Sequence, residues 1–101
     1  MNITIKEENQ QLVATLEGDL NNMASTKAER DLSPLMERSD CDIVLDCAGL
    51  NYISSSGLRI LLNIFKHARV SGRQAILRHL SSDVEEVFEI SGFLQLFKVE
   101  Q

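Results

Sequence analysis

The run DIVLDC, residues 42–47, constrains the fold of this chain more than any other segment. Its centre is apolar and rich in β-branched side chains, which is typical of a strand that is buried on both faces. Strands of this kind belong to parallel sheets, in which helices connect one strand to the next. The run therefore predicts an α/β fold in which helical segments flank the central strand.

The segments before this run predict a hairpin and a helix. Residues 2–6 and 11–17 alternate between apolar and polar side chains, and the polar segment between them is short enough to close a β-hairpin. A capping-box pattern that begins at Thr26 predicts the start of a helix. Pro34 lies inside the helical pattern, so we expect this helix to be kinked or split there.

The segments after the run predict alternating helices and strands. Residues 48–53 are expected to connect the central strand to a long helix over about 54–70. A strand over 74–80, a helix over 82–92 that Gly92 stops, and a short strand over 97–99 complete the chain. The order β-β-α-β-α-β-α-β predicts a single α/β domain over residues 1–101. Its sheet should be mixed and mostly parallel, with an N-terminal antiparallel hairpin and packed helices.

Size and charge limit the classes of function. The chain has 101 residues, enough for one domain, and its net charge of -5 argues against a nucleic-acid partner. It has no apolar run of membrane-spanning length and no signal-peptide pattern, so we expect a cytoplasmic protein that does not enter a membrane. Residues 56–79 form a local positive segment without any acidic residue; its cations are Arg59, Lys66, Arg69, Arg73 and Arg78.

The sequence gives little support for a catalytic site or a metal site. A nucleophilic serine needs a neighbouring base, and His67 would lie roughly 16 Å from Ser56 on the same helix. The position of His79 relative to the serines does not follow from the sequence. No phosphate-binding loop or hydrolase motif is present, and Cys41 and Cys47 make neither a disulfide framework nor a zinc site. We therefore expect no catalytic residue, no metal and no cofactor, and Cys47 should be a buried small apolar residue.

The long helix carries apolar residues on two sides. Leu58, Leu61 and Phe65 belong to one stripe that should face the core. Ile60 and Ile64 fall well away from this stripe. Either a neighbouring helix covers them, or they form an exposed apolar pair that contacts a partner protein. We predict that both are at least partly exposed.

Three serines stand at the start of this helix. Ser54, Ser55 and Ser56 are all good capping residues, but a helix needs only one of them as its cap. Phosphorylation is the alternative role, because the amides and the dipole of a helix N-terminus tolerate negative charge. Arg59 lies one turn further on and could meet such a phosphate. The residues alone leave both roles open.

At this point the sequence resembles a known family. The stretch LDCAGLNYISSSGLRILL, residues 45–62, closely resembles the central signature of STAS domains, especially those of bacterial anti-sigma factor antagonists. Leu16–Leu20 resembles the L-x-G-E-L turn of the family, and Ile90–Phe93 resembles its I-S-G-L motif. The element order is similar along essentially the whole chain.

The resemblance implies a function and a set of residues. An antagonist binds an anti-sigma factor, usually also a serine kinase, and thereby releases a sigma factor. The kinase phosphorylates a serine at the start of the second long helix, the antagonist dissociates, and a metal-dependent phosphatase resets it. Laying residues 54–57 on the family's D-S-S-G and I-S-S-A-G forms places this serine at Ser55. Together with Ile60 and Ile64 from the helix projection, the predicted partner contacts are Ser54, Ser56, Gly57, Arg59, Asp19 and Asn21.

The sequence also departs from the family pattern. Ser54 replaces the acidic residue of the D-S-S-G form, and Asn21 stands where some members carry aspartate. The chain ends soon after Val99, where the family has a further helix, so we expect a less covered face that favours a partner or a homodimer. The alternative function is a STAS subunit that is not phosphorylated, in an ABC lipid transporter or a stress-signalling scaffold.

Overall fold

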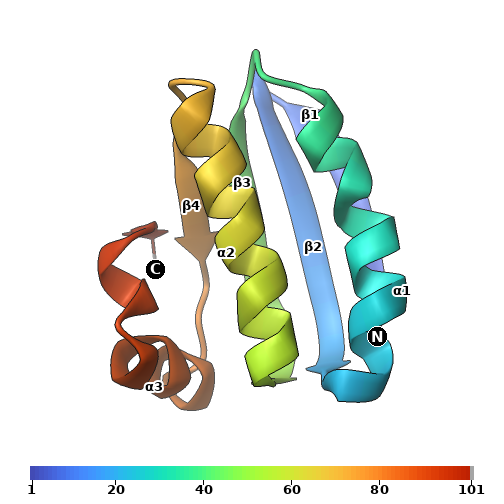
Figure 1. Ribbon diagram of the computed structural model, residues 1–101, viewed down its shortest axis with the longest axis vertical. Coiled ribbons are helices and arrows are strands. Elements are labelled where there is room, and N and C mark those ends of the chain that lie inside the picture. Colours follow the sequence, from blue (N-terminus) through green and yellow to red (C-terminus); the bar gives the residue numbers. More distant parts are fainter. Residues whose placement is uncertain (101) are drawn as a thin grey trace.

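The computed structural model describes residues 1–100, which form a five-stranded sheet with helices packed against it (Figure 1). The strands are β1 (Asn2–Glu8), β2 (Gln11–Leu20), β3 (Asp42–Ile53), β4 (Ala75–Arg78) and β5 (Lys98–Glu100). The helices are α1 (Asn22–Leu32), α2 (Ser55–Val70) and α3 (Ser82–Ser91), with short 3-10 helices at Ser33–Glu37 and Phe93–Gln95.

The strands follow the order β1-β2-β3-β4-β5 across the sheet. β1 pairs with β2 in antiparallel orientation, whereas β2 with β3, β3 with β4 and β4 with β5 are parallel. This confirms the mixed, mostly parallel sheet with one N-terminal hairpin. The parallel pairs need crossovers, and the helices supply them.

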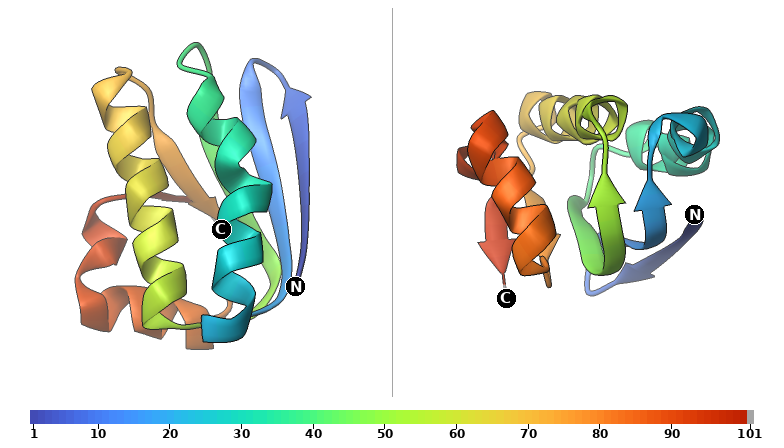
Figure 2. Two further views of the ribbon diagram at one scale, coloured as in Figure 1. Left: turned by 45° about the vertical axis from the view of Figure 1, so that its right-hand side comes forward. Right: turned by 90° about the horizontal axis from the view of Figure 1, so that it is seen from below.

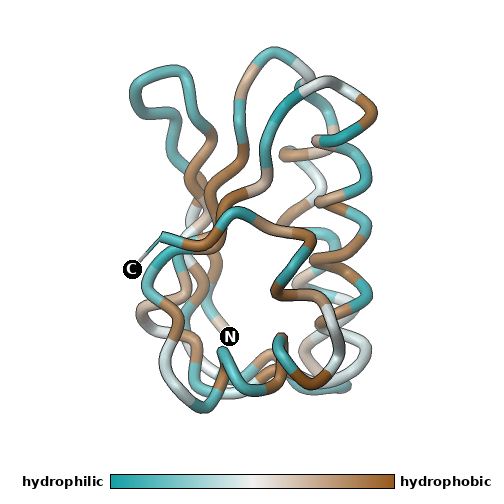
Figure 3. Tube along the Cα trace, turned by 90° about the vertical axis from the view of Figure 1, so that its left-hand side faces the viewer, coloured by the Kyte–Doolittle hydropathy of each residue, from teal (hydrophilic) through white to brown (hydrophobic). Residues whose placement is uncertain are grey.

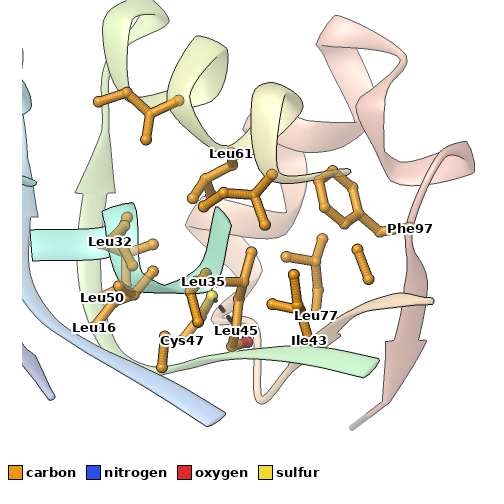
Figure 4. Packing of buried hydrophobic residues seen from close by; sticks show 14 of the residues in the cluster. Leu16, Leu32, Leu35, Ile43, Leu45, Cys47, Leu50, Leu61, Leu77 and Phe97 are labelled. Atoms are coloured by element: carbon orange, nitrogen blue, oxygen red, sulfur yellow. Dashed lines mark hydrogen bonds between the residues drawn. The ribbon is translucent and has the colours of Figure 1, made fainter. Parts of the chain in front are cut away.

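One large core joins all three helices to the sheet. α1 and α2 lie side by side over one face of the sheet (Figure 2), and the buried side chains of α3 belong to the same cluster. Phe97 packs between two aromatic rings, with centroids 5.3 Å from Phe65 and 6.0 Å from Phe88. Leu45 and Leu61 lie in the middle of the cluster (Figure 4), so β3 and α2 depend on each other for burial.

The other face of the sheet has its own small buried row. Val13, Val44 and Ile76 pair across β2, β3 and β4, and all three are buried. The buried side chains of the helices all belong to the first cluster, so this row is separate from the main core. The prediction that the central strand is buried on both faces is confirmed.

Two predicted boundaries near the centre of the chain are wrong. β3 does not end at Cys47 but continues to Ile53, and β2 continues to Leu20. The two strands stay paired from Glu17 onwards because register shifts absorb the irregular residues. The expected connector over 48–53 is therefore the second half of a strand.

The helix starts also differ from the sequence patterns. α1 begins at Asn22 because Asn21 caps it, with its Oδ1 accepting a hydrogen bond from the Ala24 amide at 2.9 Å. Thr26 consequently lies inside the helix instead of at its start. The split at Pro34 is confirmed, since α1 ends at Leu32 and a 3-10 helix follows.

Ile60 and Ile64 are buried, so the prediction that they are exposed is wrong. Their exposed fractions are 7% and 2%. α1 packs beside α2 and covers the side of α2 that points away from the sheet stripe (Figure 2). A projection of one helix alone cannot show that a second helix lies next to it. The interpretation that a neighbouring helix covers both residues is the correct one.

Hydropathy follows this arrangement along the trace. Apolar residues recur along the strands and helices, whereas the loops at the top of the view are hydrophilic (Figure 3). Among the residues that the structure describes, no helix has both the length and the apolar character needed to cross a membrane.

The burial of Ile64 leads to a stability prediction. We expect Ile64→Ala to lower the free energy of unfolding by about 2–5 kcal/mol, because it leaves a cavity between α1 and α2. The control Val70→Ala, on the same helix but 89% exposed, should change it by less than about 0.5 kcal/mol. Urea denaturation measures both values. Equal, small effects would show that Ile64 is not a core residue.

Candidate functional site

The ends of β2 and β3 position the start of α2. Leu20 and Ile53 are the last paired residues of the two strands. Immediately after them, the Ser54 amide donates a hydrogen bond to the Leu20 carbonyl at 2.8 Å. The three serines are therefore held at the carboxyl edge of the parallel strands, next to the start of α1 (Figure 1).

Ser54 is the N-cap of α2. Its backbone is extended, and its Oγ accepts a hydrogen bond from the Gly57 amide at 3.2 Å. The hydroxyl therefore satisfies a first-turn amide, and the residue as a whole is buried. The capping role expected from the sequence is confirmed for this serine.

Ser56 joins the starts of two helices. Its hydroxyl donates a hydrogen bond to Oδ1 of Asn22, the first residue of α1. The neighbouring Asn21 caps α1, so consecutive asparagines fix one helix start to the other. Ser56 is half-buried, and its hydroxyl is already engaged.

Ser55 differs from both neighbours. It is the first residue of α2 and is exposed. Within residues 1–100, the side-chain hydrogen bonds at this helix start involve Ser54 and Ser56 but not the Ser55 hydroxyl. Of the three serines, Ser55 alone therefore has a hydroxyl that is both accessible and uncommitted.

Gly57 has a packing role. A Cβ atom at this position would lie 2.7 Å from Leu20 Cγ and 2.9 Å from Ile53 Cγ1. The absence of a side chain lets the first turn of α2 approach the ends of β2 and β3. Gly57 is buried, so its predicted contact with a partner is corrected to a contact within the core.

The remaining predicted contacts divide by exposure. Asp19, Asn21 and Arg59 are exposed around the start of α2, and Ser56 and Arg59 line one hollow of about 170 Å³. Ser54, Gly57, Ile60 and Ile64 are buried. The structure thus brings the exposed set together at one end of the molecule and assigns the buried set to the fold.

Two further residues at this end were not predicted. Tyr52, near the end of β3, and Ile90, in the last turn of α3, are exposed apolar side chains. Both line a hollow of about 340 Å³ that also contains Ser55. Tyr52 was assigned to a connector, and nothing in the sequence shows that the end of α3 lies beside the start of α2.

The histidines and cysteines do not add chemistry to this end. The His67 Nε2 atom lies 2.7 Å from the Arg38 carbonyl, and the His79 Nδ1 atom lies 3.2 Å from an Asp46 carboxylate oxygen. Burial raises the pKa of the Cys47 thiol to about 12, so this thiol stays protonated. In the part of the chain that the structure describes, no three His, Cys, Asp or Glu side chains gather into a metal site.

Comparison with known proteins agrees with this fold. The STAS domain family model matches residues 2–101, so the chain belongs to the STAS domain family. BtrV of Bordetella bronchiseptica, which is named as an anti-sigma factor antagonist, is 37% identical over 99 residues. The match covers 98% of this chain and 85% of BtrV.

Two solved structures of SpoIIAA, a cell fate determinant of Bacillus named as an anti-sigma factor antagonist, share the fold. The unphosphorylated form superposes with a TM-score of 0.81 at 20% identity, over 99% of this chain and 89% of that chain. The phosphorylated form superposes with a TM-score of 0.73 at 19% identity, over 99% and 92%. At these identities the similarity establishes the fold alone.

The position of Gly57 leads to the second prediction. Alanine usually stabilises a helix relative to glycine, but here its Cβ would collide with Leu20 and Ile53. We expect Gly57→Ala to lower the free energy of unfolding by about 1–3 kcal/mol. Arg59→Ala, in the same helix but exposed, is the control and should change it by less than about 0.5 kcal/mol. A stabilised Gly57→Ala variant in urea denaturation would contradict the packing role.

Proposed function

We propose that this protein is an anti-sigma factor antagonist that phosphorylation of Ser55 switches off. The observation that carries the proposal is that the three serines have different roles. Ser54 caps the helix, Ser56 binds Asn22, and only Ser55 offers a free, exposed hydroxyl. The relationship to BtrV along almost the whole chain supports the same role.

The helix start accepts a phosphate without loss of the fold. Ser55 is the first residue of α2, where free amides and the positive end of the helix dipole favour an anion. Its side chain takes part in no side-chain hydrogen bond of the described residues, so modification breaks no bond among them. The cap at Ser54 and the bond between Ser56 and Asn22 remain in place.

The same phosphate interferes with binding. An anti-sigma factor that acts on Ser55 has to cover the exposed residues around it, among them Asp19, Asn21 and Arg59. A phosphate adds a charge of about -1.5 to -2, which the complex would have to desolvate or pair. A cost of about 3 kcal/mol is enough for a roughly hundredfold loss of affinity.

In this proposal the chain is a binding protein and a substrate, not an enzyme. The partner supplies the kinase activity in the cytoplasm, and a separate metal-dependent phosphatase removes the phosphate. This assignment agrees with the site, where the neighbouring hydroxyls serve as a helix cap and as a link to α1.

The third prediction concerns the site of phosphorylation. Incubation with the cognate anti-sigma kinase and ATP, followed by mass spectrometry, should place one phosphate on Ser55. Ser56→Ala is the matched control. It should still be phosphorylated on Ser55, because the Ser56 hydroxyl, which binds Asn22 in the wild type, is not the expected target. Ser55→Ala should bind the kinase and resist release by ATP. Ser55→Asp should stay folded and bind about a hundredfold more weakly.

Other outcomes would change the assignment. Phosphate on Ser54 or Ser56 in the wild-type protein would show that the accessible hydroxyl is not the target. A different result would favour the constitutive STAS subunit: no phosphate on the wild-type protein, together with equal binding of the wild type and of Ser55→Asp to a transporter ATPase or a scaffold.

A further inference from the structure

We propose that the hollow beside Ser55 is an apolar docking groove for the same anti-sigma kinase. The groove is defined by Tyr52, Leu58, Val87 and Ile90, with Ser55 on its edge. It should receive an apolar side chain of the kinase that is flanked by basic residues. The inference rests on the proposed function, and it identifies the contacts that supply affinity.

Three elements that are distant in sequence build this groove. Tyr52 comes from the end of β3, Leu58 from the first turns of α2, and Val87 and Ile90 from the second half of α3. The hollow has a volume of about 340 Å³, room for a large side chain, and no charged side chain lines it. The lining selects an apolar occupant, because a charged group placed there would lose its hydration without gaining a partner.

Two of the groove residues, Tyr52 and Ile90, are unusually exposed for this chain, whereas Val87 is half-buried and Leu58 is buried. Ile90 is 79% exposed and Tyr52 is 51% exposed, although the other residues of similar size mostly lie in the core. Single exposed apolar residues are common, but these two come from different elements and line the same hollow as the candidate phosphorylation site. Such a group of apolar side chains beside polar ones is typical of an interaction surface.

The charge of α3 indicates what surrounds the occupant. This helix carries four acidic residues and no basic one. Asp83 and Glu85 lie in its first turn, where the helix dipole favours them. Glu89 lies in the last turn, where the dipole disfavours an acid, and Glu86 lies one turn before Ile90 on the same side. The helix dipole does not favour these two acids, whereas basic residues of a partner would pair with them.

The position of Ser55 identifies the partner. A kinase that phosphorylates this hydroxyl must bring the reacting phosphorus to about 3–3.5 Å from Ser55 Oγ. Because Ser55 lines the groove, the protein that covers this serine also covers Tyr52 and Ile90. A phosphate on Ser55 would then stand at the edge of a buried apolar contact, and the need to dehydrate it there explains how one modification weakens the whole interface.

The test compares variants of the full chain in binding to the purified cognate anti-sigma kinase. By isothermal titration calorimetry, Ile90→Ser should raise the Kd at least tenfold. In Ser55 phosphorylation it should raise KM with little change in kcat, since it does not contact the reacting atoms. Val70→Ser is the matched control, because Val70 is an 89% exposed apolar residue at the other end of α2 and should leave both constants unchanged.

A second variant keeps the test independent of folding. Glu86→Lys reverses a surface charge without changing any residue that lines the groove. It should also weaken binding to the kinase, and the loss of affinity should become smaller as the salt concentration increases. Unfolding curves for all variants should match the wild type. If Ile90→Ser affects binding only because it unfolds, Glu86→Lys still decides the matter, and its failure to weaken binding would overturn the proposal.

The outcomes separate this inference from the proposed function. A wild-type protein that is phosphorylated on Ser55, with Ile90→Ser and Glu86→Lys binding as the wild type does, would overturn the groove and leave the switch intact. A wild-type protein that neither binds the kinase nor is phosphorylated would overturn both. A self-association that sedimentation detects and that Ile90→Ser abolishes, without any effect on kinase binding, would assign the groove to a second copy and also overturn the inference.

Discussion

The parallel pairing of β2 with β3 positions every part of the candidate site. The two strands stay in register as far as Leu20 and Ile53, beyond the point where the apolar run of β3 ends. α1 then starts two residues after Leu20, and α2 starts two residues after Ile53. Because both helix starts follow directly from one pair of strand ends, the distance between Asn22 and Ser56 is fixed by the sheet, and their hydrogen bond closes the arrangement. Gly57 completes it by allowing the first turn of α2 to rest against Leu20.

The elements that could be predicted from the sequence are those that depend on local patterns. The buried strand at residues 42–47, the hairpin, the break at Pro34 and the glycine end of α3 at Gly92 all follow from patterns within about ten residues. The continuation of β3 to Ile53 could not be predicted, since its irregular residues are held by pairing with β2. The choice of Asn21 over Thr26 as the cap of α1 depends in the same way on where β2 ends.

The candidate site was predictable in its central residue but not in its surface. The serine motif leaves the three serines equivalent, and the family resemblance indicates Ser55; the structure adds a physical reason, the engagement of Ser54 and Ser56. The burial of Ile60 and Ile64 depends on α1, and the groove with Tyr52 and Ile90 depends on α3. Neither contact can be predicted from the sequence of α2 alone.

At this end of the molecule, the groups that stabilise the fold differ from the groups that a partner would contact. This difference suits the proposed phosphorylation switch. Buried groups hold the helix start: the Ser54 cap and the contact of Gly57 with the strand ends. Exposed groups that contribute little to the fold surround it, among them Ser55 and Ile90. A modification that had to disturb the cap would cost folding free energy each time it occurred. Under the proposed function, a phosphate on Ser55 would change only the exposed set, so the domain would pass between a binding and a non-binding form while its core stays the same.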